Sequence, residues 1–467
     1  MNLTDEQQDI ISISKKLKKN ETLKIDACAG SGKTATLIEI AKANPQSKFL
    51  YLAFNKAIVE EAKSRFPSNV TIKTTHGLAY REVVYKYKTA SKKTMEINSK
   101  LNVFDLEPLY ADANRKDLQY VLNGYLSFLH SAETDFPNKD IEKLFNAVEN
   151  GKLPLTHDHY LKVYQKRGSH PELNAYDFIL LDEAQDINPV TKSIFLNNEC
   201  KKILVGDTHQ SIYAFRGAVN VLKEFDSLYT LHLSNCFRCP ESITDKANYF
   251  LFKYSNDREE LVPIKSLLAH QSEDIDSSAV ISRTNSRLIT EINDLDKEEI
   301  KNYKLIRHPS LIFKPCFNVL KLIQKKTNFD PEFSYFNNFT SLEELRDYAD
   351  EANDHELTCA IGITKKFEGY LFELYNLAMK MYENDSSSAN NYLTTAHSSK
   401  GLEFDAITLC EDFPSLEHFF DDEKKKTLDL KEQFQQEVNL YYVALTRAKK
   451  ELTDYTQNND EYELNHE

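Results

Sequence analysis

Residues 27–34 read ACAGSGKT, a run that combines two glycines with a lysine and a threonine. Gly30 and Gly32 let the backbone curl so that several N–H groups point inward, an arrangement that suits an anion. Lys33 adds a cation, and Thr34 adds a hydroxyl oxygen at the start of a predicted helix. The pattern predicts a loop that binds nucleotide phosphates, with Lys33 on the β- and γ-phosphates and Thr34 on Mg²⁺. The nucleotide-binding residues predicted from this loop are Ala29, Gly30, Ser31, Gly32, Lys33 and Thr34.

Two adjacent carboxylates follow a run of four apolar residues, 178–181. The run predicts a buried strand that carries Asp182 and Glu183 at its carboxyl end. Beside a phosphate loop, Asp182 would hold Mg²⁺ through water, and Glu183 would orient or deprotonate an attacking water. The other interpretation is an acidic turn at the surface, and the phosphate loop upstream favours the catalytic one.

A third segment, 203–218, places a glutamine and two aromatic residues just beyond another apolar run. Gln210 lies where a side chain can sense the γ-phosphate by a hydrogen bond. Tyr213 and Phe215 would stack on nucleobases, an interaction that tolerates any base. Core packing is the other interpretation of two aromatic residues at this spacing.

The elements that must position these residues form an alternating pattern. Apolar runs at 23–27, 49–53, 70–73, 178–181 and 203–205 predict buried parallel strands, and helical patterns separate them. A second α/β core is expected from the runs at 279–282, 392–395 and 406–409. The predicted parts are 1–84 and 171–225 for the first core, 85–170 for its mainly helical insertion, 226–320 and 388–467 for the second core, and 321–387 for a reduced insertion in it. The polar tail after Thr456 is expected to be frayed.

Composition narrows the class of protein. The 467 residues are 41% hydrophobic and carry a formal net charge of −14, which excludes a chain coated in basic residues but not local contacts with nucleic acid. No run of 18 apolar residues and no signal peptide occur, so we expect no membrane contact and a cytoplasmic, nucleoid-associated protein, or a nuclear one in a eukaryote. Cys236 and Cys239 lack a second ligand pair, which favours structural thiols over a metal site.

The order of these segments resembles superfamily 1 helicases of the UvrD/Rep/PcrA type, and within them the helicase part of F-box DNA helicases. The similarity spans about residues 3–455. Residues 3–7 resemble the adenine-reading Q motif with Gln7, and 394–405 resemble motif V with Glu403. Residues 237–238 resemble motif IV, and Glu437 with 442–449 resembles motif VI.

The resemblance implies a P-loop NTPase with two RecA-like cores, ATP and Mg²⁺ between them, and 3′-to-5′ movement along single-stranded DNA. Arg238 and Arg447, both in the second core, would stabilise the transferring phosphate, as such arginines do at a gain of about 10³–10⁵ in rate. Gln7, Phe237 and Glu403 would contact the nucleotide. The DNA contacts implied by the resemblance or by stacking are Phe54, Asn55, Thr75, His76, Tyr213, Phe215, Asn285, Thr395 and His397.

Departures from the family pattern keep two functions open. Ala35 stands where many relatives carry arginine near the adenine, and Phe215 replaces a common tryptophan. The short insertion at 321–387 suggests that duplex unwinding is weak or depends on a partner. The leading hypothesis is an ATP-driven translocase and 3′–5′ helicase on single strands or single-strand/duplex junctions. The alternative is a DNA-activated ATPase subunit that licenses a partner nuclease in repair or anti-phage defence. A phosphate-loop kinase or a metabolic ATPase explains neither the aromatic segment nor the arginines of the second core.

Overall fold

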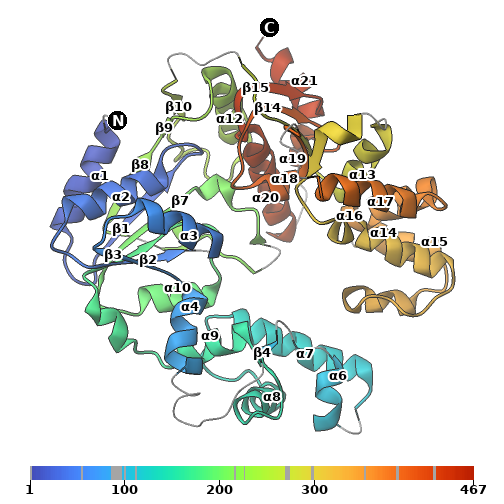
Figure 1. The fold of residues 1–467 in the computed structure, drawn as a ribbon, viewed down its shortest axis with the longest axis horizontal. Helices are drawn as coiled ribbons and strands as arrows, with labels where there is room; N and C mark the ends of the chain where they lie inside the picture. The colour runs from blue at the N-terminus through green and yellow to red at the C-terminus, as the bar shows by residue number, and fades with distance from the viewer. Residues whose placement is uncertain are drawn as a thin grey trace. The chain divides into compact units, whose positions relative to one another are not determined.

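The computed structural model describes residues 3–53, 56–85, 97–98, 101, 103–110, 113–214, 217–225, 227–268, 274–295, 299–351, 354–384, 389–423 and 428–466. The chain divides into two compact units, Met1–Asn235 and Cys236–Glu467. Each unit contains a parallel β-sheet that is covered by helices (Figure 1). The fold class predicted from the sequence, α/β with two parallel-sheet cores, is confirmed.

The first unit is built on six strands in the order β3-β2-β6-β7-β1-β8, all parallel. Every residue of β2 and β6 is buried, as expected for central strands covered on both faces. The strands are β1 (Thr22–Ala27), β2 (Phe49–Ala53), β3 (Val70–Thr74), β6 (Phe178–Leu181), β7 (Lys201–Gly206) and β8 (Tyr229–Leu233). The helices that alternate with these strands along the chain are α1 (Asp5–Lys16), α2 (Lys33–Ala43), α3 (Lys56–Arg65), α10 (Pro189–Leu196) and α11 (Val221–Glu224).

A mainly helical segment lies between β3 and β6. Its side chains share one hydrophobic cluster with residues of the sheet, among them Leu50, Leu52 and Leu181. The segment is therefore packed onto the sheet and does not form a separate core. Its elements are α4 (Thr75–Ala79), the π-helix η1 (Tyr80–Tyr85), β4 (Ile97–Asn98), α6 (Val103–Leu106), η2 (Glu107–Leu109), α7 (Arg115–His130), α8 (Lys139–Glu149), β5 (Leu155–Thr156), α9 (His157–Lys166) and η3 (Pro171–Ala175).

The second unit is built on five parallel strands in the order β12-β13-β11-β14-β15. The strands are β11 (Ser278–Ser282), β12 (Tyr303–Leu305), β13 (Asn391–Thr395), β14 (Phe404–Leu409) and β15 (Ala448–Asp454), and a separate pair joins β9 (Asn235–Cys236) to β10 (Lys265–Ser266). The helices are α12 (Glu241–Tyr254), α13 (Asn285–Asp294), α14 (Pro309–Ile323), α15 (Leu342–Glu351), α16 (His355–Phe367), α17 (Leu371–Tyr382), α18 (Ala396–Ser399), α19 (Leu416–Glu423), α20 (Leu428–Leu445) and α21 (Gln457–Leu464).

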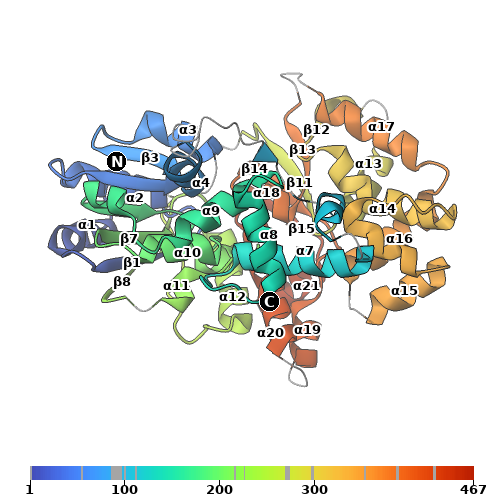
Figure 2. The same cartoon turned by 90° about the horizontal axis from the view of Figure 1, so that it is seen from below.

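Helices α14, α15 and α16 lie side by side (Figure 2) and enclose a small cluster that includes Val319, Leu345 and Ile361. This cluster is distinct from the one that packs helices α13, α14 and α17 against the sheet. The segment between β12 and β13 thus carries a small apolar core of its own.

All eight strands predicted from the sequence lie within observed strands, and the two large sheets gain β8, β12 and β15, which were not predicted. The expectation of a frayed tail is wrong. Helix α21 begins after Thr456, whose hydroxyl accepts from the backbone N–H of Asn459. Asn458 is fully buried, and Glu461 accepts hydrogen bonds from Tyr249, Lys253 and Tyr254. The tail docks through buried polar side chains, which composition alone presents as solvent-facing.

No helix within the described ranges is long and apolar enough to cross a membrane. Cys236 and Cys239 are both buried and free, and the backbone N–H of Cys239 donates to the sulfur of Cys236 at 3.3 Å.

Candidate nucleotide site

The loop between β1 and α2 has the backbone that its glycines predict. Gly30 and Gly32 adopt φ values of 68° and 79°, in the left-handed region that favours glycine. Gly32 is the N-cap of α2, and no side chain caps this helix end. The first N–H groups of α2 therefore remain available to an anion, and Lys33 and Thr34 form the first turn beside them.

Thr34 and Asp182, the two predicted metal ligands, come together in the structure. The Thr34 hydroxyl donates to Asp182 Oδ2 at 3.3 Å, although the residues are far apart in sequence. Burial and the neighbouring Glu183 carboxylate raise the pKa of Asp182. The Thr34 hydroxyl and the buried Asp182 carboxylate are hard oxygen donors of the kind that Mg²⁺ takes, so the residues present fit that ion.

Glu183 has a backbone φ of 53°, which is uncommon for a residue with a side chain. Such strain persists only where surrounding contacts hold it, and it gathers at functional sites. The Glu183 backbone donates to Asp182 Oδ1 at 3.0 Å and accepts from the Asp186 N–H at 3.0 Å. The Glu183 side chain accepts from the amide nitrogen of Gln185 at 2.5 Å. The strained backbone and this bond together fix the carboxylate that the sequence assigns to the attacking water.

Gln185 also connects Glu183 to the predicted γ-phosphate sensor. Gln185 is fully buried, and its Oε1 accepts from the backbone N–H of Asp207 at 3.1 Å. The Asp207 carboxylate in turn accepts from Gln210 Nε2 at 2.6 Å. A continuous hydrogen-bonded chain therefore runs Glu183–Gln185–Asp207–Gln210. We name it the amide relay. Sequence reasoning missed Gln185 and Asp207, although both follow strand ends within motifs that it had singled out.

Gln7, the predicted adenine reader, holds two helices together. Its Oε1 accepts from the Thr4 backbone N–H at 3.1 Å, and its Nε2 donates to the Thr36 hydroxyl at 3.1 Å. Thr4 and Gln7 thereby form a capping box at the start of α1, and Thr36 belongs to α2.

The candidate arginines of the second unit bond to their own unit. Arg447 is 1% exposed, and its guanidinium donates to Val443 O, Leu402 O and the Thr446 hydroxyl. Arg238 is more accessible, with Nε 2.6 Å from Glu403 Oε2 and Nη1 donating to Thr446 O. Glu403 is thus beside Arg238, and Phe237 is half-buried next to it in the chain.

A family model described as the UvrD-like helicase C-terminal domain matches residues 54–456. The chain belongs to the UvrD-like helicase family. The family predicted from the sequence is confirmed.

Named relatives agree with this family assignment. The chain is 31% identical to F-box DNA helicase 1 of Gallus gallus, over 96% of this chain and 48% of that protein. It is 30% identical to F-box DNA helicase protein 1 of Schizosaccharomyces pombe, over 96% of this chain and 57% of that protein. Gabija protein GajB of Bacillus cereus is 24% identical, over 93% of both chains. The chain spans about half the length of the two F-box relatives.

The segments that resemble DNA contacts of the UvrD-like family lie at the carboxyl ends of strands. Thr75 begins α4 directly after β3, and Thr395 is the N-cap of α18 after β13, with His397 in that helix. Tyr213 is half-buried. Asn285 Nδ2 donates to Glu356 of α16 at 2.9 Å, so its amide faces the helical insertion. The predicted contacts Phe54, Asn55 and Phe215 lie outside the described residues.

His76 is joined to the helical insertion of the first unit. Its Nε2 lies 3.5 Å from Asp158 Oδ1, and His130 Nε2 lies 3.2 Å from Asp158 Oδ2. Burial acts to raise the pKa of the Asp158 carboxyl, but hydrogen bonds from His130 and His76 outweigh it and hold that pKa well below its usual range. The ionised Asp158 therefore anchors His76.

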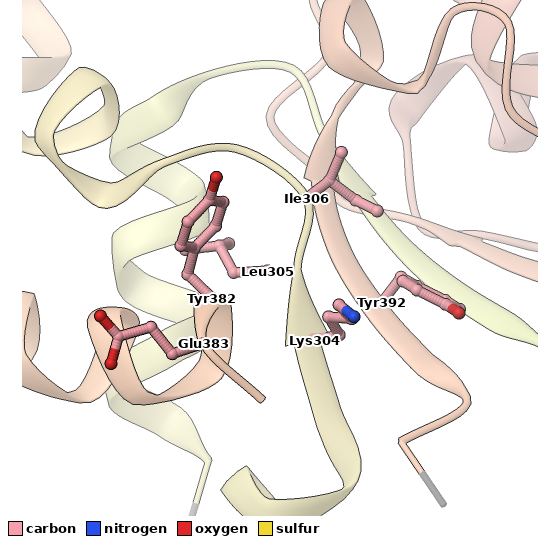
Figure 3. A pocket seen from close by; sticks show the side chains of 6 residues that line it. All are labelled: Lys304, Leu305, Ile306, Tyr382, Glu383 and Tyr392. Carbon is pink, nitrogen blue, oxygen red and sulfur yellow. The ribbon is translucent and has the colours of Figure 1, made fainter. Parts of the chain in front are cut away.

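A pocket of about 510 Å³ lies at the edge of the second sheet, and Figure 3 shows the six side chains that line it. They are Lys304, Leu305, Ile306, Tyr382, Glu383 and Tyr392. None of them is a predicted site residue.

Proposed function

We propose that this chain is an ATP-dependent DNA helicase that moves 3′ to 5′ along single-stranded DNA. The observation that carries the proposal is the convergence of Thr34, Asp182 and Glu183 at one edge of the first sheet, beside an uncapped helix N-terminus. This arrangement supports binding and hydrolysis of Mg²⁺–ATP, and membership of the UvrD-like helicase family supports its coupling to DNA.

The proposed hydrolysis uses residues of the chain in distinct roles. Lys33 neutralises the β- and γ-phosphates, and Thr34 and Asp182 hold Mg²⁺, which would offset the charge that develops on the phosphates. Glu183 orients the attacking water and accepts its proton. Gln210 would sense the γ-phosphate, and the amide relay would tie its position to that of Glu183.

The proposal divides further roles between the two units. Thr75, His76, Tyr213, Thr395 and His397 would contact single-stranded DNA, because the resembling motifs do so in this family. Arg238 and Arg447 would stabilise the transferring phosphate for the same reason. Both assignments rest on resemblance, and the described contacts of Arg447 already engage three of its five N–H groups.

A second candidate function is a DNA-activated ATPase subunit that licenses a partner nuclease. Two observations favour it. The insertion between β12 and β13 has a small apolar core of its own, and a relative named Gabija protein GajB matches over 93% of both chains.

One experiment separates the two functions. ATP hydrolysis is measured with and without single-stranded DNA, beside unwinding of duplexes that carry either a 3′ or a 5′ single-stranded tail, with Lys33→Ala as the inactive control. The proposal expects stimulated hydrolysis and unwinding of the 3′-tailed duplex alone. Stimulated hydrolysis without unwinding of either duplex would favour the ATPase subunit, and unwinding from the 5′ tail would contradict the polarity.

A further inference from the structure

One buried phenol reaches the predicted metal site from the interior of the first sheet. Tyr51 lies in the middle of β2, is fully buried and packs its ring against Phe66 at a centroid distance of 4.8 Å. In the sheet register Tyr51 is paired with Leu180 of β6, two residues before Asp182. Its hydroxyl donates to Asp182 Oδ2 at 2.7 Å.

The phenol can act here only as a donor. A tyrosine hydroxyl keeps its proton at neutral pH, and Asp182 Oδ2 accepts from it. Asp182 is thereby held by three donors. Oδ2 accepts from Tyr51 and Thr34, and Oδ1 accepts from the Glu183 backbone N–H at 3.0 Å. Two of these donors belong to the nucleotide motifs, and the third comes from a strand to which no nucleotide role is assigned.

We propose that Tyr51 is a positioning residue for the Mg²⁺ of the nucleotide site, an inference that rests on the proposed function. Tyr51 acts through Asp182: it holds the carboxylate in the orientation in which Oδ2 faces Thr34. A carboxylate that has lost this donor gains rotational freedom, and each metal-binding event must then restrict that freedom. The loss should therefore weaken metal binding and leave contacts with the nucleotide itself in place.

The competing interpretation is a buried hydroxyl that has merely found an acceptor. Both interpretations expect Tyr51→Phe to keep the ring packing against Phe66 and to lose some stability. They differ in the Mg²⁺ requirement that they predict for the variant. Only a positioning role makes the variant demand more Mg²⁺ at unchanged affinity for metal-free nucleotide.

The test compares Tyr51→Phe with Tyr254→Phe, which removes another buried phenol–carboxylate bond, Tyr254 to Glu461 at 2.6 Å, in the second unit. A fluorescent ATP analogue is bound in EDTA and across a Mg²⁺ titration, and melting temperatures are recorded. We expect both variants to match the parent within about twofold in EDTA. The Mg²⁺ concentration for half-maximal tightening should rise about tenfold in Tyr51→Phe, the size expected for a bond to a charged group, and should not change in Tyr254→Phe.

Two results overturn the inference in distinguishable ways. An unchanged Mg²⁺ requirement in Tyr51→Phe, with or without a lower melting temperature, leaves the hydroxyl a structural role only and leaves the proposed function intact. A parent protein whose nucleotide binding ignores Mg²⁺ overturns the proposed function, and the role of Tyr51 with it.

Discussion

The first unit and the second unit treat their candidate catalytic residues differently. In the first, Thr34 bonds to Asp182, and the amide relay links Glu183 to Gln210, so that the residues meant to act on one ligand are bonded to one another. In the second unit, the Arg447 guanidinium donates hydrogen bonds to Val443, Leu402 and Thr446 of the same unit.

The difference teaches that only one of the two sets is preorganised. Dipoles and charges that are already fixed cost no reorganisation during a reaction. A buried guanidinium that already donates to backbone carbonyls has part of its five N–H groups engaged before it serves a phosphate. Arg238 lies between these two cases. It is bonded within its own unit, but the side chain of its main partner, Glu403, is 50% exposed. Surface ion pairs of this kind are weak and exchange readily.

Glu183→Gln tests the preorganised set most strongly. The amide keeps the size of the side chain but cannot accept a proton, so hydrolysis should fall by about 10²–10⁴. Mg²⁺–ATP binding should persist, because Thr34 and Asp182 are untouched. The control is Glu39→Gln, the same change at the accessible partner of Lys42 on α2. Hydrolysis at the parental rate would remove Glu183 from its role.

Arg238→Ala asks whether the more accessible arginine acts on the phosphate. We expect turnover to fall about 10³-fold, with nucleotide affinity and melting temperature nearly unchanged, because the interaction develops in the transition state. The measurement is single-turnover hydrolysis beside equilibrium binding. Arg346→Ala, which removes an exposed arginine paired with Asp350 on α15, is the matched control. Equal losses in binding and turnover would make Arg238 a ground-state ligand.

Arg447→Ala should behave unlike Arg238→Ala if the contacts in the second unit are its main duty. The change removes the Arg447 donor from the Leu402 carbonyl, leaves the Val443 carbonyl only its bond from the Thr446 hydroxyl, and opens a buried space. We expect a loss of about 3 kcal/mol in the stability of the second unit, read from urea or thermal unfolding. A variant that melts like the parent but no longer hydrolyses ATP would reverse the comparison and make Arg447 a catalytic arginine.

The same contrast explains which parts of the molecule the sequence predicts. The phosphate loop and the central strands follow from local signals: glycines at fixed spacing, and apolar runs such as 178–181 that end in carboxylates. Their geometry is set within a few residues, so local patterns suffice. The convergence of Thr34 with Asp182 follows from the rule that carboxyl ends of parallel strands share one edge.

Contacts that depend on the direction of side chains across the fold could not be predicted from the sequence. Tyr51 lies in a strand that is buried throughout, so no alternation marks the residue that points to the metal site. Gln185 and Asp207 come into hydrogen-bonding distance only because β6 and β7 are neighbours in the folded sheet. The prediction of a frayed tail was wrong for a related reason. Helix α21 buries Asn458 and Glu461, and in a sequence, polar residues that pair inside a protein cannot be told from polar residues that face solvent.

Gly206→Ala is the smallest change that tests the amide relay. A Cβ at this position would lie 2.3 Å from Gln185 Oε1, too close for any real contact, and 3.0 Å from Ala184 N. The Gln185 amide must therefore move and release the Asp207 N–H and the Glu183 carboxylate. We expect hydrolysis to fall about tenfold, the worth of one strong hydrogen bond, with a stability cost of about 1–3 kcal/mol from overpacking.

Two further variants assign that loss to the relay. Gly362→Ala, in α16, adds a methyl where no atom lies within 4 Å, and it should leave hydrolysis unchanged. The double variant Gly206→Ala with Gln185→Ala provides room for the new methyl by removing the amide. If Gly206→Ala acts through Gln185, the double variant hydrolyses ATP no more slowly than Gln185→Ala alone, because the two changes break the same bonds. Losses that multiply would show that Gly206→Ala acts through the Ala184 backbone or the Leu222 side chain and not through Gln185.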